Sequence, residues 1–372
     1  MNAKRNILVL LTPGFAASEA DSSCLPMLQA LVRALVRKAP TVEIRVLALH
    51  YPFEPGTYEL FGATVQAFGG RNRGGFGRWQ RARAVRAALD SLHHYGKIAG
   101  IISCWYGEAA DHGSSFAGTY GVPHYCWMLG QDARVNNPWP RRLQLPGSAL
   151  VALSASIQAQ CASAHGVSPR CIIEPGVEAA ASLLTVERAC LLLGVGSLIP
   201  LKRWTVFLQV AAALMPAFPK LRVIVTGAGP ELARLQALST RLGLDEVVTF
   251  AGALPHQDVL TIMQQARLLL HPSEYEGYSG VCQEALSVGT PVVSFCAPHA
   301  DLPAGWTWVK TIDEMIQQAS LYLNNPDGVK PVVASIDECA QRWLEIFGLH
   351  RPDRIVINPE AIASGEKLSL NR

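Results

Sequence analysis

The feature that most constrains the fold of this chain is a repeated alternation of short apolar or β-branched runs with stretches of helical periodicity. This alternation is typical of parallel sheets whose strands are joined by crossover helices. In the first half we predict a helix at Leu25–Lys38, which ends in two basic side chains, as helix C-termini favour. The predicted strands are Ile7–Leu11, Val42–Ala48, Ile98–Ser103, His124–Met128 and Leu150–Ser154. The first half therefore predicts one doubly wound domain.

A second set of the same units follows Pro175-Gly176, where a strand-like run ends. Its predicted strands are Cys190–Val195, Arg222–Thr226, Val247–Ala251, Leu268–His271 and Pro291–Phe295. Its predicted helices are Trp204–Met215, Pro230–Leu242, Gln257–Ala266 and Gly280–Val288. Thr311 and Ser335 each precede a glutamate by three residues, which is the spacing of a capping box, and so predict two further helices.

A chain of 372 residues, 49% of them hydrophobic, is too long for one ordinary core. We therefore predict an α/β fold of two Rossmann-like doubly wound domains that face each other across a cleft. The N-terminal domain spans residues 1–176 and the second domain residues 177–330. Residues 331–372 contain the last helix and a tail without periodicity. Ligands are expected in the crevice beyond the carboxyl ends of the strands.

The N-terminus favours a buried strand over a secretion signal. Lys4 and Arg5 precede the apolar run Ile7–Leu11, but this run is shorter than a signal core and stops at Pro13-Gly14. No stretch of 18 uncharged apolar residues predicts a membrane-spanning helix. Nine cysteines occur without a CxxC pair or zinc-like spacing, which favours reduced thiols and a cytoplasmic protein.

The net charge of +3 conceals an asymmetry between the two halves. Residues 1–150 hold 16 Lys and Arg against 9 Asp and Glu, and the rest of the chain holds 16 against 20. Much of the excess lies around Trp79, in Arg71, Arg73, Arg78, Arg81, Arg83 and Arg86. One interpretation is a solvated helix face, and the other is peripheral contact with an anionic membrane or a phosphorylated acceptor. Nucleic acid is not expected as a partner, because no recognition motif accompanies these arginines.

The strongest local signal is the stretch Pro272–Ala285, which predicts a strand followed by a polar glycine loop and a helix. Its glycines permit close backbone approach, and the amides around Gly280 and Val281 open a helix whose positive end suits a phosphate. Glu276 and Glu284 flank this anion site, where two carboxylates would bind sugar and ribose hydroxyls. The alternative is an ordinary loop between strand and helix with two surface glutamates.

Two further glycine turns follow predicted strands. Lys202 and Arg203 lie at a helix start, where two cations are unfavourable unless an anion such as pyrophosphate binds between them; the alternative is a solvated pair. Gly227-Ala228-Gly229 lacks the third glycine of a dinucleotide fingerprint, because position 232 is Leu232. No DxD, GxSxG, HExxH or P-loop motif is present, so we expect a metal-independent site without a cofactor.

Taken in order, these blocks resemble the donor domain of the family-4 glycosyltransferases, within the glycosyl transferases group 1. The resemblance covers residues 150–305 and ends in an E-x7-E arrangement of Glu276 and Glu284. It implies a GT-B fold and retention of the anomeric configuration. It also implies that Glu284 holds the ribose, Glu276 contacts the donor sugar and Lys202 neutralises the diphosphate. The implied donor-binding set is Ser197, Lys202, Arg203, Gly229, Ala253, Leu254, Gly277, Ser279, Gly280, Val281 and Glu284.

The N-terminal half resembles the acceptor domain of this family more loosely, through Gly14, Gln131 and Asp132. Relatives often have a histidine where this chain has Leu129, and an arginine where it has Ser197, so no catalytic histidine is assigned. The last helix resembles the closing helix of the family, which crosses back onto the first domain.

The resemblance implies a hexosyltransferase in surface polysaccharide or glycolipid synthesis. The arginine-rich first domain favours a glycan or lipid-linked acceptor at the inner membrane face of the cytoplasm. Glu276 and Lys202 are the expected catalytic residues. The alternatives are a non-catalytic nucleotide-sugar-binding partner subunit and a sugar-nucleotide epimerase of the same fold.

Overall fold

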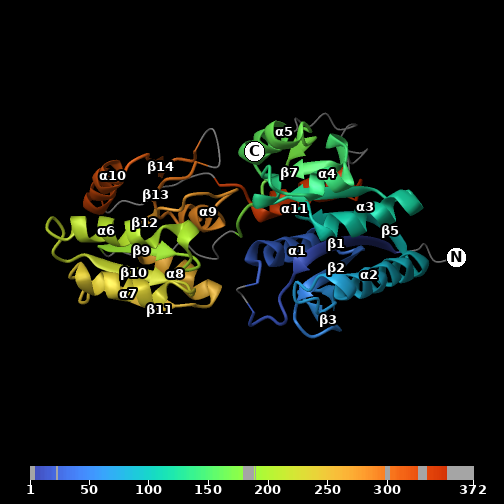
Figure 1. The fold of residues 1–372 in the computed structure, drawn as a ribbon, viewed down its shortest axis with the longest axis horizontal. Coiled ribbons are helices and arrows are strands. Elements are labelled where there is room, and N and C mark those ends of the chain that lie inside the picture. The colour runs from blue at the N-terminus through green and yellow to red at the C-terminus, as the bar shows by residue number, and fades with distance from the viewer. Residues whose placement is uncertain are drawn as a thin grey trace, which may run out of the picture.

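Two bodies, each built around a parallel sheet, make up the computed structural model (Figure 1). The first half of the chain forms the blue-to-green body and the second half the yellow-to-orange body. The structure describes residues 5–21, 24–178, 188, 190–297, 302–325 and 333–349. The small-residue segment that begins at Ala179 and the tail from residue 350 lie outside the described residues.

The N-terminal sheet has eight strands in the order β3-β4-β2-β1-β5-β6-β7-β8, and every pair is parallel except β3 with β4. The strands are β1 (Asn6–Gly14), β2 (Val42–Tyr51), β3 (Gly56–Leu60), β4 (Ala63–Ala67), β5 (Lys97–Cys104), β6 (His124–Met128), β7 (Leu150–Ala152) and β8 (Cys171–Ile172). The helices are α1 (Pro26–Lys38), α2 (Gly75–Tyr95), α3 (Glu108–Tyr120), α4 (Trp139–Leu143) and α5 (Ala155–His165). The run Ile7–Leu11 is buried at the centre of the sheet, which confirms the predicted strand.

The C-terminal sheet has six parallel strands in the order β11-β10-β9-β12-β13-β14. The strands are β9 (Leu191–Val195), β10 (Arg222–Thr226), β11 (Val248–Gly252), β12 (Leu268–His271), β13 (Val292–Ser294) and β14 (Trp306–Trp308). The helices are α6 (Trp204–Leu214), α7 (Leu232–Arg241), α8 (His256–Gln265), α9 (Gly280–Ser287) and α10 (Ile312–Asn324). Because β9 to β12 are adjacent and parallel, the loops that follow them share one edge of the sheet.

The last described helix, α11 (Ile336–Ile346), returns to the N-terminal body, where it packs into the first core (Figure 1). Its Trp343 is fully buried, and its ring lies 5.5 Å from that of Trp127. The predicted capping box at Ser335 is present, and Ser335 also forms a parallel β-bridge with Val177. The chain therefore passes between the two bodies twice at neighbouring positions.

Three local features differ from the sequence predictions. The hairpin of β3 and β4 was not predicted; it turns through Phe61 and Gly62, which both have positive φ. Strand β14 was also missed, because three residues are too few for a periodicity. The Thr311 side chain accepts from the Glu314 amide as predicted, but the Glu314 carboxylate accepts from the Lys310 amide, so this capping box is only half formed.

Candidate functional site

A cavity of about 250 Å³ lies between the two bodies, at the carboxyl edges of both sheets. The N-terminal body contributes the start of α1 and the residues that follow β6 and β7, among them Leu129 and Leu153. The passage between the bodies contributes residues 175–178. The C-terminal body contributes the starts of α8 and α9 and both glutamates of the E-x7-E arrangement, Glu276 and Glu284. The cavity is therefore in the expected crevice.

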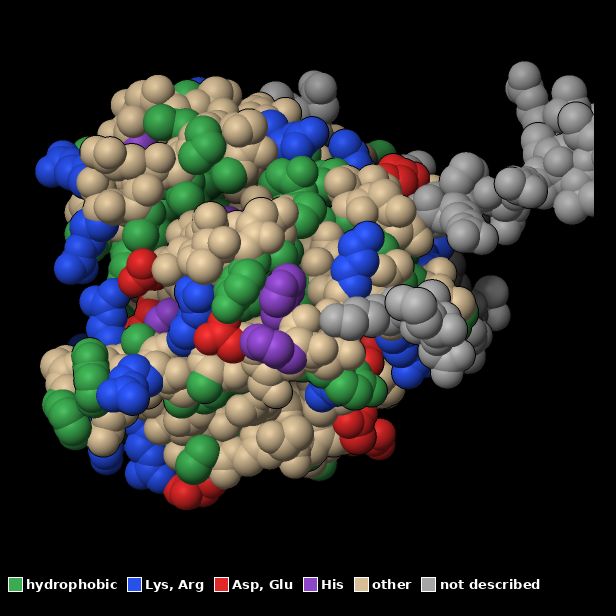
Figure 2. Space-filling view, turned by 90° about the vertical axis from the view of Figure 1, so that its right-hand side faces the viewer, with side chains coloured by type: hydrophobic (Ala, Val, Ile, Leu, Met, Phe, Trp, Pro, Cys, Tyr) green, Lys and Arg blue, Asp and Glu red, His purple; other side chains and the backbone are tan. Residues whose placement is uncertain are grey.

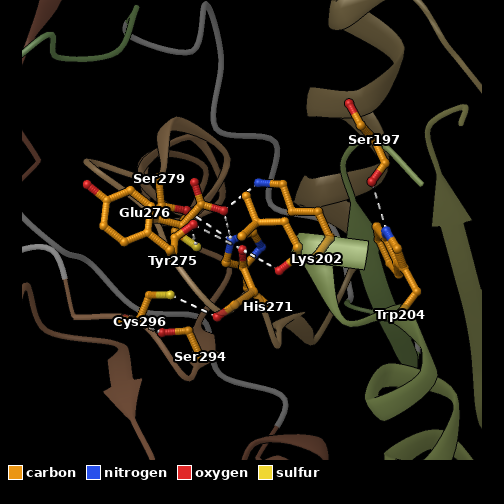
Figure 3. A network of polar contacts seen from close by, with 12 residues as sticks. Ser197, Lys202, Trp204, His271, Tyr275, Glu276, Ser279, Ser294 and Cys296 are labelled. Atoms are coloured by element: carbon orange, nitrogen blue, oxygen red, sulfur yellow. Dashed lines mark hydrogen bonds and ion pairs between the residues drawn. The ribbon is translucent and has the colours of Figure 1, made fainter. Parts of the chain in front are cut away.

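A lysine ammonium and a histidine imidazole converge on Glu276 (Figure 3). The Lys202 ammonium forms an ion pair with Glu276 Oε1, and His271 Nε2 lies 2.9 Å from the same oxygen. The side chain of Lys202 is 19% exposed, that of Glu276 is 16% exposed and that of His271 is 4% exposed. Water therefore screens the electrostatic interactions among them poorly. Burial alone would raise the pKa of Glu276, but the hydrogen bond with His271 and the charge of Lys202 outweigh it and lower the pKa to about 2. Glu276 is therefore a carboxylate at neutral pH.

The loop after β9 brings Lys202 to this cluster and directs its neighbours elsewhere. Lys202 ends the 3-10 turn Pro200–Lys202, and Arg203 then adopts a left-handed conformation before α6. The Arg203 guanidinium lies over the Phe295 ring, 4.9 Å from its centroid. Ser197 is exposed, and its carbonyl accepts from Trp204 Nε1, apart from Glu276 (Figure 3). Of the three residues predicted in this block, only Lys202 contacts Glu276.

The glycine loop presents the start of α9 to the cavity. Gly277, Ser279 and Gly280 line the cavity, and Ser279 precedes the helix in a left-handed conformation. The first helical hydrogen bond joins the Cys282 amide to the Ser279 carbonyl, so the amides of Gly280 and Val281 precede the bonded turns. Such amides, together with the positive end of a helix, favour an anion.

Glu284 is held by a histidine that the sequence reasoning missed. His256, the first residue of α8, places Nε2 3.0 Å from Glu284 Oε1, and both side chains line the cavity. The hydrogen bond with Glu284 raises the pKa of His256 above its ordinary value, although burial opposes the shift. One carboxylate oxygen thus contacts the imidazole, and the side chain lines the cavity.

This pair predicts a pH dependence. Because the pKa of His256 is raised by Glu284, the pair stabilises the protein fully below the unfolded pKa near 6.5. That stabilisation is lost as the pH rises through the folded pKa. We expect Glu284→Gln to lower the His256 pKa in an NMR titration, and its effect on the free energy of unfolding to shrink as the pH rises. An unchanged His256 titration would contradict the assigned contact.

The remaining predicted donor residues follow neighbouring strands. Gly229 lies after β10, and Ala253 and Leu254 lie after β11. The loops are linked, because the Leu198 amide donates to the Ala228 carbonyl at 2.9 Å. Gly229, Ala253 and Leu254 therefore lie at the same sheet edge as Lys202, but the cavity lining, as far as the structure describes it, includes neither these three residues nor Lys202.

On the acceptor side, Asp132 shapes its own loop. Its buried carboxylate accepts from the amides of Tyr106 at 2.8 Å, Leu129 at 3.1 Å and Gly130 at 2.8 Å. Burial raises the pKa of Asp132 to about 6, against the opposing effect of these hydrogen bonds. Gly14 is buried at the end of β1, whereas Gln131 is exposed. Of these three residues, only Gln131 is exposed to solvent.

His271 and His256 are the two site residues that the sequence reasoning missed. Each is a single histidine without a metal-like spacing, which gives a sequence pattern little weight. The available signal was positional, since His271 ends the strand before the glycine loop and His256 begins the helix after β11. Position at a shared sheet edge, not residue type, identifies them.

The arginine cluster is largely paired, which corrects one expectation. Arg81 is 5% exposed and makes two hydrogen bonds to the Glu108 carboxylate, at 2.7 and 2.9 Å, so it cannot face a membrane. Three further pairs are Arg71 with Glu54, Arg78 with Asp111 and Arg86 with Asp90. The exposed remainder consists of Arg73, Arg83 and the stacked aromatic pair of Phe76 (70% exposed) and Trp79 (53% exposed).

Two features of the described part of the chain bear on other classes of protein. None of its helices is long and apolar enough to cross a membrane. It also contains no group of three or more His, Cys, Asp or Glu side chains suited to a metal ion. The metal-independent site stays a prediction.

Residues 178–299 match the family model of the glycosyl transferases group 1. A 2-deoxystreptamine glucosyltransferase of Streptomyces kanamyceticus is 28% identical over 42% of this chain and 41% of its own length. A D-inositol 3-phosphate glycosyltransferase of Mycobacterium sp. (strain KMS) is 34% identical over 36% of this chain and 34% of its own length. The chain thus spans less than half the length of these curated relatives. The predicted resemblance to the glycosyl transferases group 1 is confirmed for residues 178–299, whereas family 4 and retention of configuration stay predictions.

Solved structures extend the similarity of fold to nearly the whole chain. HepE of Anabaena, solved with UDP and glucose, aligns with a TM-score of 0.62 over 97% of this chain and 99% of its own, at 18% identity. Sucrose-phosphate synthase of Thermosynechococcus elongatus aligns with a TM-score of 0.64 over 92% and 95%, at 15% identity. The predicted GT-B fold is confirmed.

Proposed function

We propose that this chain, whose residues 178–299 form a domain of the glycosyl transferases group 1 within a GT-B fold, is a retaining glycosyltransferase. The observation that carries the proposal is the cluster of Lys202, His271 and Glu276 beside the start of α9. A nucleotide sugar would bind the C-terminal domain, and a glycan or lipid-linked acceptor the N-terminal domain. The UDP and glucose found in HepE support this class of donor. We place the reaction in surface polysaccharide or glycolipid synthesis.

The cluster suits departure of a diphosphate. As the bond between the sugar C1 and the phosphate oxygen breaks, negative charge grows on the leaving oxygen, near the Lys202 ammonium and the amides at the start of α9. Preorganised donors of this kind are usually the largest single contribution to catalysis. The acceptor oxygen bonds to C1 on the same face, and its proton passes to the leaving phosphate oxygen. No separate base is then needed.

Glu276 would bind the sugar as a hydrogen-bond acceptor. With its pKa near 2, it holds no proton at neutral pH and cannot serve as a general acid. It would accept hydrogen bonds from sugar hydroxyls while Lys202 and the hydrogen bond with His271 keep it ionised. Glu284, through its second oxygen, would accept from the ribose hydroxyls. Arg203, Gly229, Ala253, Leu254 and Val281 would surround the diphosphate and the base.

Turnover with a panel of donors tests this proposal. The purified protein is incubated with UDP-glucose, GDP-mannose or ADP-glucose, with and without lipid and polysaccharide extracts as acceptors. We expect release of nucleoside diphosphate that depends on the acceptor, and a product whose anomeric proton shows retained configuration in NMR. An altered nucleotide sugar without acceptor indicates an epimerase. Binding without any product indicates the non-catalytic partner subunit.

We also propose that the protein acts in the cytoplasm, at the membrane face. All nine cysteines are free thiols, which suits a reducing compartment. Viewed from the outer side of the N-terminal body, Lys and Arg side chains gather along one edge, interspersed with hydrophobic ones (Figure 2). Exposed aromatic rings with nearby arginines favour an anionic lipid interface. The proposed contact is the exposed set at and just before the start of α2, which consists of Arg73, Phe76, Trp79 and Arg83.

Charge reversal tests this contact. We expect Arg73→Glu with Arg83→Glu to weaken binding to phosphatidylglycerol vesicles at low salt by at least about 30-fold, since each basic residue near an anionic surface contributes about 1 kcal/mol. Co-sedimentation measures the effect. Arg222→Glu with Arg241→Glu, two exposed arginines of the C-terminal body, is the matched control. Equal binding by both double variants would contradict the proposed contact.

A further inference from the structure

The loop that carries Glu276 forms hydrogen bonds and a cation–π contact with the N-terminal body. The Tyr275 hydroxyl donates to Gln160 Oε1 at 2.9 Å and lies 3.4 Å from the Gly130 carbonyl oxygen. The guanidinium carbon of Arg134 lies 4.0 Å from the centre of the Tyr275 ring. Ser154 Oγ donates to the Gly277 carbonyl at 3.1 Å. The two residues that flank Glu276 are thus both bound to the opposite body.

The backbones meet closely at this contact. A Cβ atom added to Gly277 would lie 2.8 Å from the Gly130 Cα, which is too close for any side chain at position 277. Gly130 itself has φ 141°, a conformation that L side chains rarely adopt. The pair of glycines therefore allows the Glu276 loop to sit directly on the loop after β6.

We propose that Tyr275 is a positioning residue that couples closure of the two bodies to the placement of Glu276. Arg134 follows β6 and Gln160 lies on α5, so Tyr275 meets both partners only when the bodies are closed. If the two bodies moved apart, Tyr275 would lose its contacts with Arg134 and Gln160, and the loop that holds the adjacent Glu276 in place would no longer be fixed. The inference rests on the proposed glycosyl transfer, for which Glu276 must lie beside the donor sugar.

Nucleotide binding and transfer should depend on this contact differently. The groups proposed to bind the nucleotide, Lys202, Glu284 and the start of α9, all belong to the C-terminal body. These groups can therefore bind the nucleotide whether or not Tyr275 contacts the N-terminal body. Correct placement of Glu276 against the sugar requires that contact, because transfer depends on precise geometry at the reacting carbon. Loss of the contact should therefore lower kcat and leave nucleotide affinity unchanged.

The experiment compares Tyr275→Phe, Tyr275→Ala and Arg134→Met with Tyr322→Phe, a half-buried tyrosine on α10, as the matched control. We expect UDP affinity to be unchanged in every variant. Loss of one hydrogen bond should lower kcat about tenfold in Tyr275→Phe, and Tyr275→Ala should lower it further because the ring over Arg134 is also lost. Adding Gln160→Ala to Tyr275→Phe should lower kcat no further.

Small-angle X-ray scattering supplies a readout that does not depend on activity. Tyr275→Ala should raise the radius of gyration of the ligand-free protein, because the closed arrangement loses its clamp. An unchanged radius, or a fall in UDP affinity that parallels the fall in kcat, would overturn the inference. If the unsubstituted protein neither binds nor turns over any donor, the proposed function fails. The scattering measurement still shows whether Tyr275 holds the two bodies together.

Discussion

Replacing Lys202 with methionine should lower the rate of sugar transfer by about 100- to 1,000-fold, which is the usual cost of removing one preorganised donor from a developing negative charge. The substitution keeps much of the length of the side chain and removes its charge. Lys202 forms an ion pair with Glu276, which lines the cavity, and its side chain is only 19% exposed, so water would replace its charge poorly. Initial rates of nucleoside diphosphate release at saturating donor measure the effect.

The control for this variant is Lys220→Met, which removes an exposed lysine from the same body. Its rate should equal that of the unsubstituted protein. The pKa of Glu276 should rise in Lys202→Met, because the ammonium charge that helps to lower it to about 2 is gone. A Lys202→Met variant with full kcat would remove Lys202 from the mechanism.

The second large effect is expected for Glu284→Ala, which should weaken binding of the nucleoside diphosphate roughly 10- to 150-fold. Hydrogen bonds to a charged group contribute about 1.5–3 kcal/mol, and this range corresponds to that loss of affinity. The Glu284 carboxylate lines the cavity with one oxygen on His256. We propose that the other oxygen accepts from the ribose. Isothermal titration calorimetry gives the Kd.

Two controls separate a ribose contact from a general disturbance. Glu246→Ala removes an exposed carboxylate from the same body and should leave the Kd unchanged. UDP and 2′,3′-dideoxy-UDP should bind the Glu284→Ala variant with similar affinity, because the hydroxyls have lost their acceptor. If Glu284→Ala reduces the affinity for both nucleotides equally, the ribose assignment is wrong.

The sequence predicted the fold well where apolar runs are continuous. Strands β6, β10 and β12 have the predicted bounds, and α9 begins at Gly280 as expected. Parallel β-strands buried on both faces leave a strong pattern, and their order along the chain places the following loops at one edge. The family resemblance predicted Lys202 and Glu276, which are 74 residues apart, in one donor site, and the structure joins the two side chains in an ion pair.

What the sequence could not give depends on contacts between distant segments. The sequence predicted Arg81 in an exposed basic cluster, but its side chain is buried in an ion pair with Glu108 of another helix. His271 and His256 have no local pattern, because their partners lie on the next helix or loop. Asp132 was placed on the acceptor side, but its oxygens accept from backbone amides of its own body. Side-chain pairs of this kind leave no periodic pattern in the sequence, so they could not be predicted from it.

The most direct test of the central claim, that the cleft binds the nucleotide part of a sugar donor, is thermal unfolding with UDP, GDP and ADP. A ligand that binds only the folded state at 100 times its Kd adds about 2.7 kcal/mol to the free energy of unfolding. We predict a rise in melting temperature with one nucleotide that is reduced in Lys202→Met and Glu284→Ala and retained in Lys220→Met. No rise with any of the three, or an equal rise in all variants, would contradict the claim.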